Sequence, residues 1–234
     1  MSIESNYTRF KWFLKSYIHR DGVDKLIEFL DSSDAATAPA STRYHLCVEG
    51  GYIQHSLNVF NRLITLLKHE YGDNIPFSKE SIAIVALLHD ISKVNYYKKS
   101  LRNVKDENGK WKSVEQFVVR EDDERLVFGT HEENTIEILS EFLQLTREEK
   151  IALLYHMGNT TDSTDQYHAA RMMTAYKQFP LAVFLHTADL LATCIDEVEV
   201  KEEKPKEEKK AETPESNGQD TSTAVKHTEE QVPF

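Results

Sequence analysis

The chain has 234 residues, of which 40% are hydrophobic, and its 28 Lys and Arg against 39 Asp and Glu give a formal net charge of −11. A negative charge of this size argues against a protein that coats duplex nucleic acid or an anionic membrane, because both need a basic surface. Two cysteines without CxxC spacing exclude a disulfide framework, and no apolar run approaches the roughly 20 residues of a membrane span, so we expect a cytoplasmic protein.

Hydrophobic periodicity predicts an all-α fold. Through most of the first 197 residues, apolar side chains recur every three or four positions, as in helices that bury one face. Ser78 is typical of a residue that begins a helix, and Pro180 separates the last two helices. The predicted helices cover residues 7–19, 22–31, 51–70, 78–90, 131–144, 147–157, 166–178 and 181–197.

The segment 101–128 departs from the helical pattern. Asn108-Gly109 lies between two partly alternating runs, and this dipeptide is typical of a type I′ turn. We therefore expect a small β-hairpin, near residues 101–120, inserted among the helices.

The end of the chain has a different composition from the rest. Residues 196–234 hold 12 acidic residues and 6 lysines, and the stretch is nearly free of aromatic and branched apolar side chains. Such a segment buries too little surface to offset its chain entropy, which predicts a disordered acidic tail from about residue 198. A charged interaction tail is the alternative interpretation.

Several histidines and aspartates fall on apolar faces of the predicted helices, where a lone polar side chain is costly to bury. A histidine alone in such a place is more often a hydrogen-bonded core residue than a ligand. Adjacent His89 and Asp90 at the end of an apolar helix are a less usual pair to bury, and a metal ion would compensate both. The candidate metal ligands are His55, His89, Asp90, His131, His156 and Asp189.

The order of these residues resembles the H…HD…H…H…D signature of the HD-domain superfamily of metal-dependent phosphohydrolases, and ALLHDISK resembles its central ALLHDIGK motif. STRYHLCVEGGYIQHSLNVFNRL is similar to the first segment of bacterial and phage-type HD hydrolases. The resemblance covers residues 35–197, so it implies an HD-domain helical bundle there, with residues 1–34 as helices packed on this core and 198–234 as the tail.

The resemblance also implies a division of the ligands. His55, His89, Asp90 and Asp189 match the four that hold one metal throughout the superfamily. His131 and His156 match the two extra histidines of its binuclear branch, in which Asp90 bridges both metals. Four imidazoles and two carboxylates favour one or two ions of Fe, Mn, Zn, Co or Ni over Mg²⁺, which prefers oxygen ligands.

Other residues are candidates for substrate contact. Lys93 follows Asp90 where the family motif also has lysine, and we expect both to take part in catalysis, because an ammonium there neutralises a phosphate. Ser92 replaces the usual glycine, a change that we interpret as harmless. Residues 93–112 carry seven Lys and Arg against two acids, which is consistent with a phosphate-steering edge or with a plain solvated surface. The expected substrate-binding residues are Arg43, His45, Lys93, Asn159 and Arg171.

These features predict a phosphohydrolase that cleaves a phosphomonoester or phosphodiester of a nucleotide or short oligonucleotide through a metal-bound hydroxide. The expected partner is a small phosphorylated substrate. Two alternatives remain open from the sequence: a di-iron oxygenase of the same superfamily, which the resemblance implies has the same ligand set, and a non-catalytic HD module that binds a nucleotide.

Overall fold

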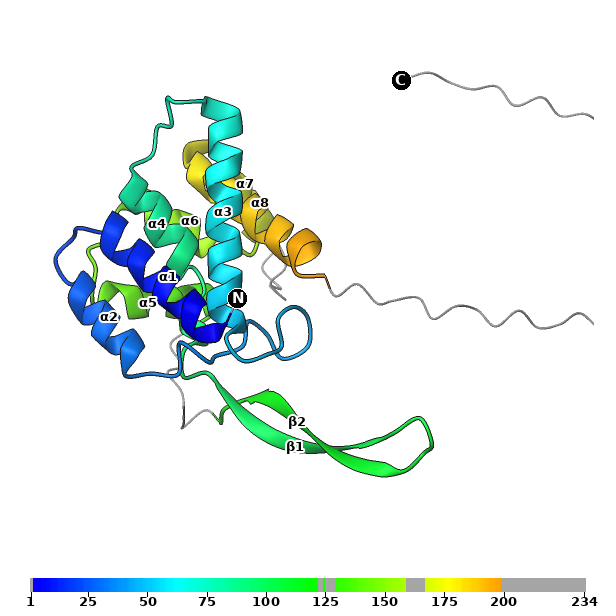
Figure 1. Ribbon diagram of the computed structural model, residues 1–234. Coiled ribbons are helices and arrows are strands. Elements are labelled where there is room, and N and C mark those ends of the chain that lie inside the picture. Colours follow the sequence, from blue (N-terminus) through cyan, green and yellow to red (C-terminus); the bar gives the residue numbers. More distant parts are fainter. Residues whose placement is uncertain (1, 122–123, 125–128, 159–166, 199–234) are drawn as a thin grey trace, which may run out of the picture. The chain divides into compact units, whose positions relative to one another are not determined.

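Helices make up most of the computed structural model, as the hydrophobic pattern predicts (Figure 1). The long helix α3 contacts both α4 and α8, and α1 packs on α3 and α4. The all-α prediction is therefore confirmed. The helices are α1 (Ile3–Tyr17), α2 (Val23–Asp31), α3 (Gly51–Tyr71), α4 (Lys79–Leu88), α5 (His131–Ser140), α6 (Arg147–Leu154), α7 (His168–Gln178) and α8 (Pro180–Leu191), with a 3₁₀ turn η1 (Ile91–Lys93) and a π-helical turn η3 (Ala192–Asp196).

The structure describes residues 2–121, 124, 129–158 and 167–198. The described residues all belong to one unit, Met1–Glu199, and the second unit, Val200–Phe234, lies outside the described residues. Residues 199–234 of the tail that is predicted to be disordered lie outside the described residues. The predicted domain boundaries after residues 34 and 197 stay predictions.

Helix α4 lies at the centre of the core and carries the chain to the histidine–aspartate pair. Its residues Ile82 to Leu88 are all buried, so the helix is apolar on every side rather than along one stripe. Ser78 begins it as predicted, because its side chain accepts a hydrogen bond from the Ser81 N–H at 2.9 Å. The helix ends at Leu88, which leaves His89 and Asp90 at its buried end.

Two capping boxes determine where α5 and α6 begin. Thr130 accepts from the backbone of Glu133, whose carboxylate accepts in return from the Thr130 N–H, and Thr146 and Glu149 form the same pair before α6. The first box makes His131 the first residue of α5, and this end of the helix lies beside Asp90.

The predicted hairpin is present, although its position and turn differ from the prediction. Strands β1 (Tyr97–Lys105) and β2 (Trp111–Val119) pair antiparallel; the hairpin begins four residues before the expected position 101 and ends at Val119, close to the expected end at 120. In the connecting loop, Gly109 has a φ of +75° but Asn108 does not have a positive φ. A type I′ turn needs positive φ at both central residues, so that part of the prediction is wrong: the loop places glycine alone in the left-handed region.

Helices α7 and α8 meet at a bend of 111°, where Pro180 begins α8. No single helix in the described ranges is long and apolar enough to cross a membrane, and α7 with Pro180–Asp196 passes that test only as a bent pair. Leu181, Leu185 and Ala188 of α8 are buried in the core.

A buried ion pair joins the N-terminal helices to the rest of the core. The Arg20 guanidinium donates to both carboxylate oxygens of Glu149, at 2.7 and 2.6 Å, and to Glu80 at 3.2 Å. Burial raises the pKa of Glu149, but the hydrogen bonds and charge of Arg20, together with the hydrogen bonds from Thr146 and Ser81, outweigh burial, and the pKa is lowered. Glu149 has no exposed side-chain area, so its charge depends on this one cation.

We predict that Arg20→Ala destabilises the fold by about 3–5 kcal/mol at pH 7, because it leaves the Glu149 carboxylate buried without a cation. Since the folded pKa of Glu149 is lowered, the stability that the pair contributes is present above the unfolded pKa and is lost as the pH falls through the folded pKa. Urea denaturation should therefore show the deficit of the variant shrinking in acid. A deficit that is independent of pH would contradict this account.

Candidate metal centre

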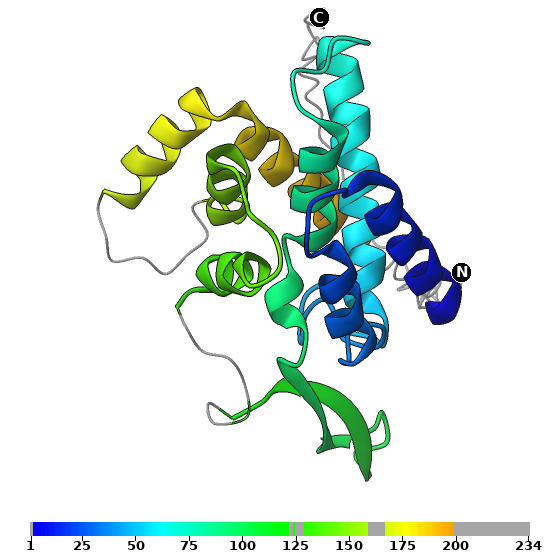
Figure 2. The same ribbon diagram turned by 90° about the vertical axis from the view of Figure 1, so that its left-hand side faces the viewer.

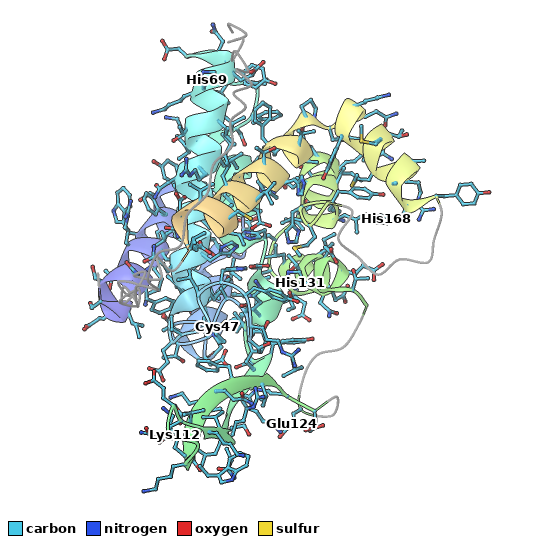
Figure 3. All side chains as sticks on the ribbon, turned by 90° about the vertical axis from the view of Figure 1, so that its right-hand side faces the viewer. Cys47, His69, Lys112, Glu124, His131 and His168 are labelled. Carbon is cyan, nitrogen blue, oxygen red and sulfur yellow. The ribbon has the colours of Figure 1, made fainter. Side chains whose placement is uncertain are left out.

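Six polar side chains from five helical regions converge at the buried end of α4. They combine into clusters whose nitrogen and oxygen atoms all lie within 4.8 Å of one another. Figure 3 shows His131 among the helices, whereas His69 lies at the far end of α3. The converging residues are the predicted ligands: His55 on α3, His89 and Asp90 after α4, His131 on α5, His156 after α6 and Asp189 on α8.

The Asp90 carboxylate divides the cluster into two half-sites. Its Oδ2 faces the Nε2 atoms of His55 and His89, each 3.5 Å away. Its Oδ1 faces His131 Nε2 at 2.6 Å and His156 Nε2 at 3.8 Å. Asp189 Oδ1 lies 3.2 Å from His55 Nε2 and so belongs to the first group. One carboxylate therefore links two groups of imidazoles.

Each of the histidines after α4 and α6 is held in one tautomer by a main-chain acceptor. His89 Nδ1–H donates to the Ala86 carbonyl at 3.0 Å, and His156 Nδ1–H donates to the Leu153 carbonyl at 2.6 Å. The Nε2 atoms are thereby turned toward the cluster, as in metal-bound histidines. His156 Nε2 is buried and has no hydrogen-bond partner in the structure, an arrangement that a metal ion would satisfy.

His55 is oriented by a carboxylate that sequence reasoning missed. Glu197 accepts from His55 Nδ1, with Nδ1–oxygen distances of 3.0 and 3.1 Å, and from the Asn58 amide at 2.8 Å. It follows the π-helical turn, and π-helical turns are frequent at functional sites. In the sequence, Glu197 opens a long charged run, so no local pattern distinguishes it from the tail.

The charges of the first half-site compensate one another. Burial lowers the pKa of His89 to about 3. Burial also opposes the charge on His55, but its hydrogen bonds to Asp189 and Glu197 raise that pKa to about 9. These two pKa shifts agree with a hydrogen bond in which the Nε2–H of cationic His55 donates to Nε2 of neutral His89, at 3.2 Å. Burial raises the pKa of Asp90, yet the Lys93 ammonium in contact with it and His89 hold that pKa well below its usual range.

Ser92 is more than a harmless replacement. Its hydroxyl forms a hydrogen bond with His131 Nδ1 at 2.7 Å, which a glycine could not make. Thr135 donates to the His89 carbonyl at 3.0 Å and lies 3.1 Å from the Ser92 hydroxyl. The serine therefore orients His131 as main-chain carbonyls orient His89 and His156.

A close packing contact fixes the turn that carries His156. His186, which is one turn before Asp189, has its Nδ1 2.7 Å from the His156 carbonyl. Gly158 has a φ of +66°, and a Cβ there would lie 2.5 Å from the His186 ring. A larger residue at this position would push the turn away from α8.

A cavity of about 940 Å³ borders the second half-site. Its walls include Lys93 and His131, and the His131 side chain is 30% exposed whereas that of His55 is 1% exposed. Tyr96, Tyr97 and Tyr155 also line it. The second half-site is thus the one that a molecule in the cavity can reach.

The predicted substrate residues are placed differently relative to this cavity. His45, Lys93 and Arg171 line it. Both ring nitrogens of His45 are buried without a hydrogen-bond partner, and burial lowers its pKa to about 4. Arg43 is exposed and does not line the cavity, and Asn159 lies outside the described residues.

The HD domain family model matches residues 52–194, a range that contains all six converging side chains. The chain therefore belongs to the HD domain family, which places it in a superfamily of metal-dependent hydrolases. The cluster of histidines and aspartates is compatible with an HD metal site. Searches of curated proteins and of solved structures found no match.

We predict that Glu197→Ala weakens the binding of Mn²⁺ or Co²⁺ about 10- to 100-fold, because His55 loses the carboxylate that orients it. The control is Asp196→Ala, which removes a neighbouring carboxylate that instead accepts from Arg62, at 2.8 Å from its Nε. Isothermal titration calorimetry measures both affinities. Equal affinities in the two variants would show that Glu197 does not support the site.

Proposed function

We propose that the chain is a metal-dependent phosphohydrolase that cleaves a phosphomonoester or phosphodiester of a nucleotide or short oligonucleotide. The observation that supports this most is the linking position of Asp90: one carboxylate serves two half-sites, and one half-site borders a cavity that also contains a lysine. A volume of about 940 Å³ is large enough for a nucleotide-sized ligand.

The six converging residues would hold the metals. His55, His89, Asp189 and Asp90 Oδ2 form the first group, and His131, His156 and Asp90 Oδ1 form the second. Imidazole and carboxylate together favour first-row ions such as Fe, Mn, Zn, Co or Ni over Mg²⁺. When bound, a pair of such ions lowers the pKa of a coordinated water and stabilises charge on phosphoryl oxygens.

The residues around the second half-site provide binding and orientation. Lys93 is 13% exposed at its side chain and lines the cavity, so its ammonium can face both Asp90 and a substrate phosphate. His45 also lines the cavity, with its ring centroid 4.7 Å from that of His55 and its Nε2 atom 3.9 Å from the Glu197 carboxylate. Tyr96 and Tyr97 supply aromatic surface that suits a nucleobase.

For the metal site, we predict about two ions per chain by elemental analysis of the protein reconstituted with Mn²⁺ or Fe²⁺. Asp90→Ala should lose both ions, since it removes the shared ligand, whereas His156→Ala should keep about one in the first half-site. His69→Ala, an exposed residue at the end of α3 (Figure 3), is the control and should keep both. Full metal content in Asp90→Ala would contradict the shared-ligand geometry.

For catalysis, we predict that Lys93→Met lowers kcat for bis-p-nitrophenyl phosphate by about 10²-fold, because a cation facing the phosphoryl oxygens is lost. Metal content, measured in parallel, should be unchanged. Lys98→Met is the control, since Lys98 is bound to Glu124 at 2.8 Å on the hairpin. A loss of activity that merely follows a loss of metal would remove Lys93 from the chemistry.

The same assay run without oxygen tests the oxygenase alternative. A phosphohydrolase releases phosphate or nucleotide at the same rate with and without O₂. A reaction that consumes O₂ and releases neither product would transfer the assignment to an HD-type oxygenase.

A further inference from the structure

The hairpin projects from the helical body at the edge of the cavity. Figures 1 and 2 show β1 and β2 running away from the helices, and Figure 3 places Lys112 far from His131. Its base is attached to the rest of the chain: Lys99 Nζ lies 2.7 Å from the Glu49 carboxylate, and the Arg120 guanidinium lies 3.7 Å from the Asp34 carboxylate. Isolated two-stranded ribbons are marginally stable in water, so contact with a binding partner would stabilise this hairpin.

One face of the ribbon carries apolar and aromatic side chains from the cavity to the tip. Residues directly opposite in an antiparallel pair share a face, and every second residue returns to it. The pairs on this face are Tyr97 with Val119, Lys99 with Phe117, Leu101 with Glu115, Asn103 with Ser113, and Lys105 with Trp111. Tyr97 lines the cavity, whereas Leu101 is 73% exposed and Trp111 64% exposed.

The basic side chains near the base of the hairpin are already paired. Lys98 contacts Glu121 and Glu124, and Lys99 contacts Glu49 and Glu115. Carboxylates beside both ammonium groups offset their charge, which weakens the case for a phosphate-steering edge at residues 98 and 99.

The distal half of the hairpin differs in charge. Four cations there form no ion pair with any residue of the described ranges, and Lys105 Nζ lies 5.2 Å from the centroid of the Trp111 ring. Of the acids at the tip, Asp106 accepts from the N–H groups of Asn108 and Lys110, both at 2.9 Å. The four cations are Lys105 on the face of Trp111, Arg102 and Lys112 on the opposite face, and Lys110 in the connecting loop.

We propose that the distal half of the hairpin, with Trp111 on one face and cations on both faces and in the loop, binds single-stranded nucleic acid and guides it toward the cavity. Exposed aromatic rings interleaved with cations are the elements on which unpaired bases stack and phosphates pair. Nine residues at about 3.3 Å each give the ribbon a length of about 30 Å, enough for several nucleotides. The inference rests on the proposed phosphodiesterase function and narrows its substrate to an oligonucleotide.

A single strand fits these observations better than the other occupants. Stacking on Trp111 needs unpaired bases, which a duplex does not offer. A second copy of the chain, docked hairpin to hairpin, would bring the same four cations close to their counterparts, so that like charges repel.

The experiment measures binding of fluorescein-labelled dT₂₀ and U₂₀ to the full chain by anisotropy, in an Asp90→Ala background that prevents cleavage. Trp111→Ala should weaken binding about tenfold, since a stacked base is lost. Trp12→Ala removes another exposed tryptophan, 58% exposed on α1, and should have no effect. Lys110→Ser with Lys112→Ser should reduce the slope of log K against log salt by about 1.4, whereas Lys68→Ser with Lys79→Ser should not change it.

Several outcomes would overturn the proposal. These are equal effects of Trp111→Ala and Trp12→Ala, duplex DNA bound as tightly as dT₂₀, or a dimer of the wild-type chain in sedimentation that Trp111→Ala dissociates. In an otherwise wild-type chain, the hairpin variants should hydrolyse bis-p-nitrophenyl phosphate normally. Oligonucleotide binding without any hydrolysis by the metal-loaded wild type would contradict the proposed function alone, and hydrolysis without oligonucleotide binding would contradict the hairpin proposal alone.

Discussion

The Asp90 carboxylate is the feature on which the rest of this structure depends. It lies 2% exposed at the end of an apolar helix, where an uncompensated charge would be severely destabilising. Imidazoles from α3, α5 and the turn after α6 surround it together with the Lys93 ammonium. The helices of the core therefore have to meet at this one point. Their meeting produces two half-sites that share the Asp90 carboxylate, one through Oδ2 and the other through Oδ1.

A second requirement is orientation, which the protein meets with acceptors outside the cluster. Main-chain carbonyls hold His89 and His156, the Ser92 hydroxyl holds His131, and Glu197 holds His55. Because each ring is bound through Nδ1, all four present Nε2 to the centre. The arrangement costs little reorganisation when an ion binds, which is the general condition for a tight metal site.

The two half-sites differ in their access to solvent, and this difference shapes the proposed chemistry. The first is enclosed by α3, α4 and α8, whereas the second borders the cavity through partly exposed His131. Lys93 and Tyr97 continue the cavity toward the hairpin. The buried first half-site, the second half-site beside the cavity and the hairpin thus follow one another in space.

The sequence by itself determined the helical class, the hairpin and the six converging side chains, because hydrophobic period and the HD motif are local signals that survive without coordinates. Tertiary structure alone decided the rest. Glu197 reaches His55 only because a π-helical turn follows α8. Ser92 orients His131 only because α5 begins beside it. The conformation of the loop at Gly109 depends on its hydrogen bonds to Asp106, and the Asn-Gly dipeptide alone did not determine it. Likewise, the sequence does not show that Lys98 and Lys99 form ion pairs, which they do with Glu124 and Glu49 in the structure. Each of these depends on contacts between residues distant in the chain or on backbone geometry, and a linear pattern records neither.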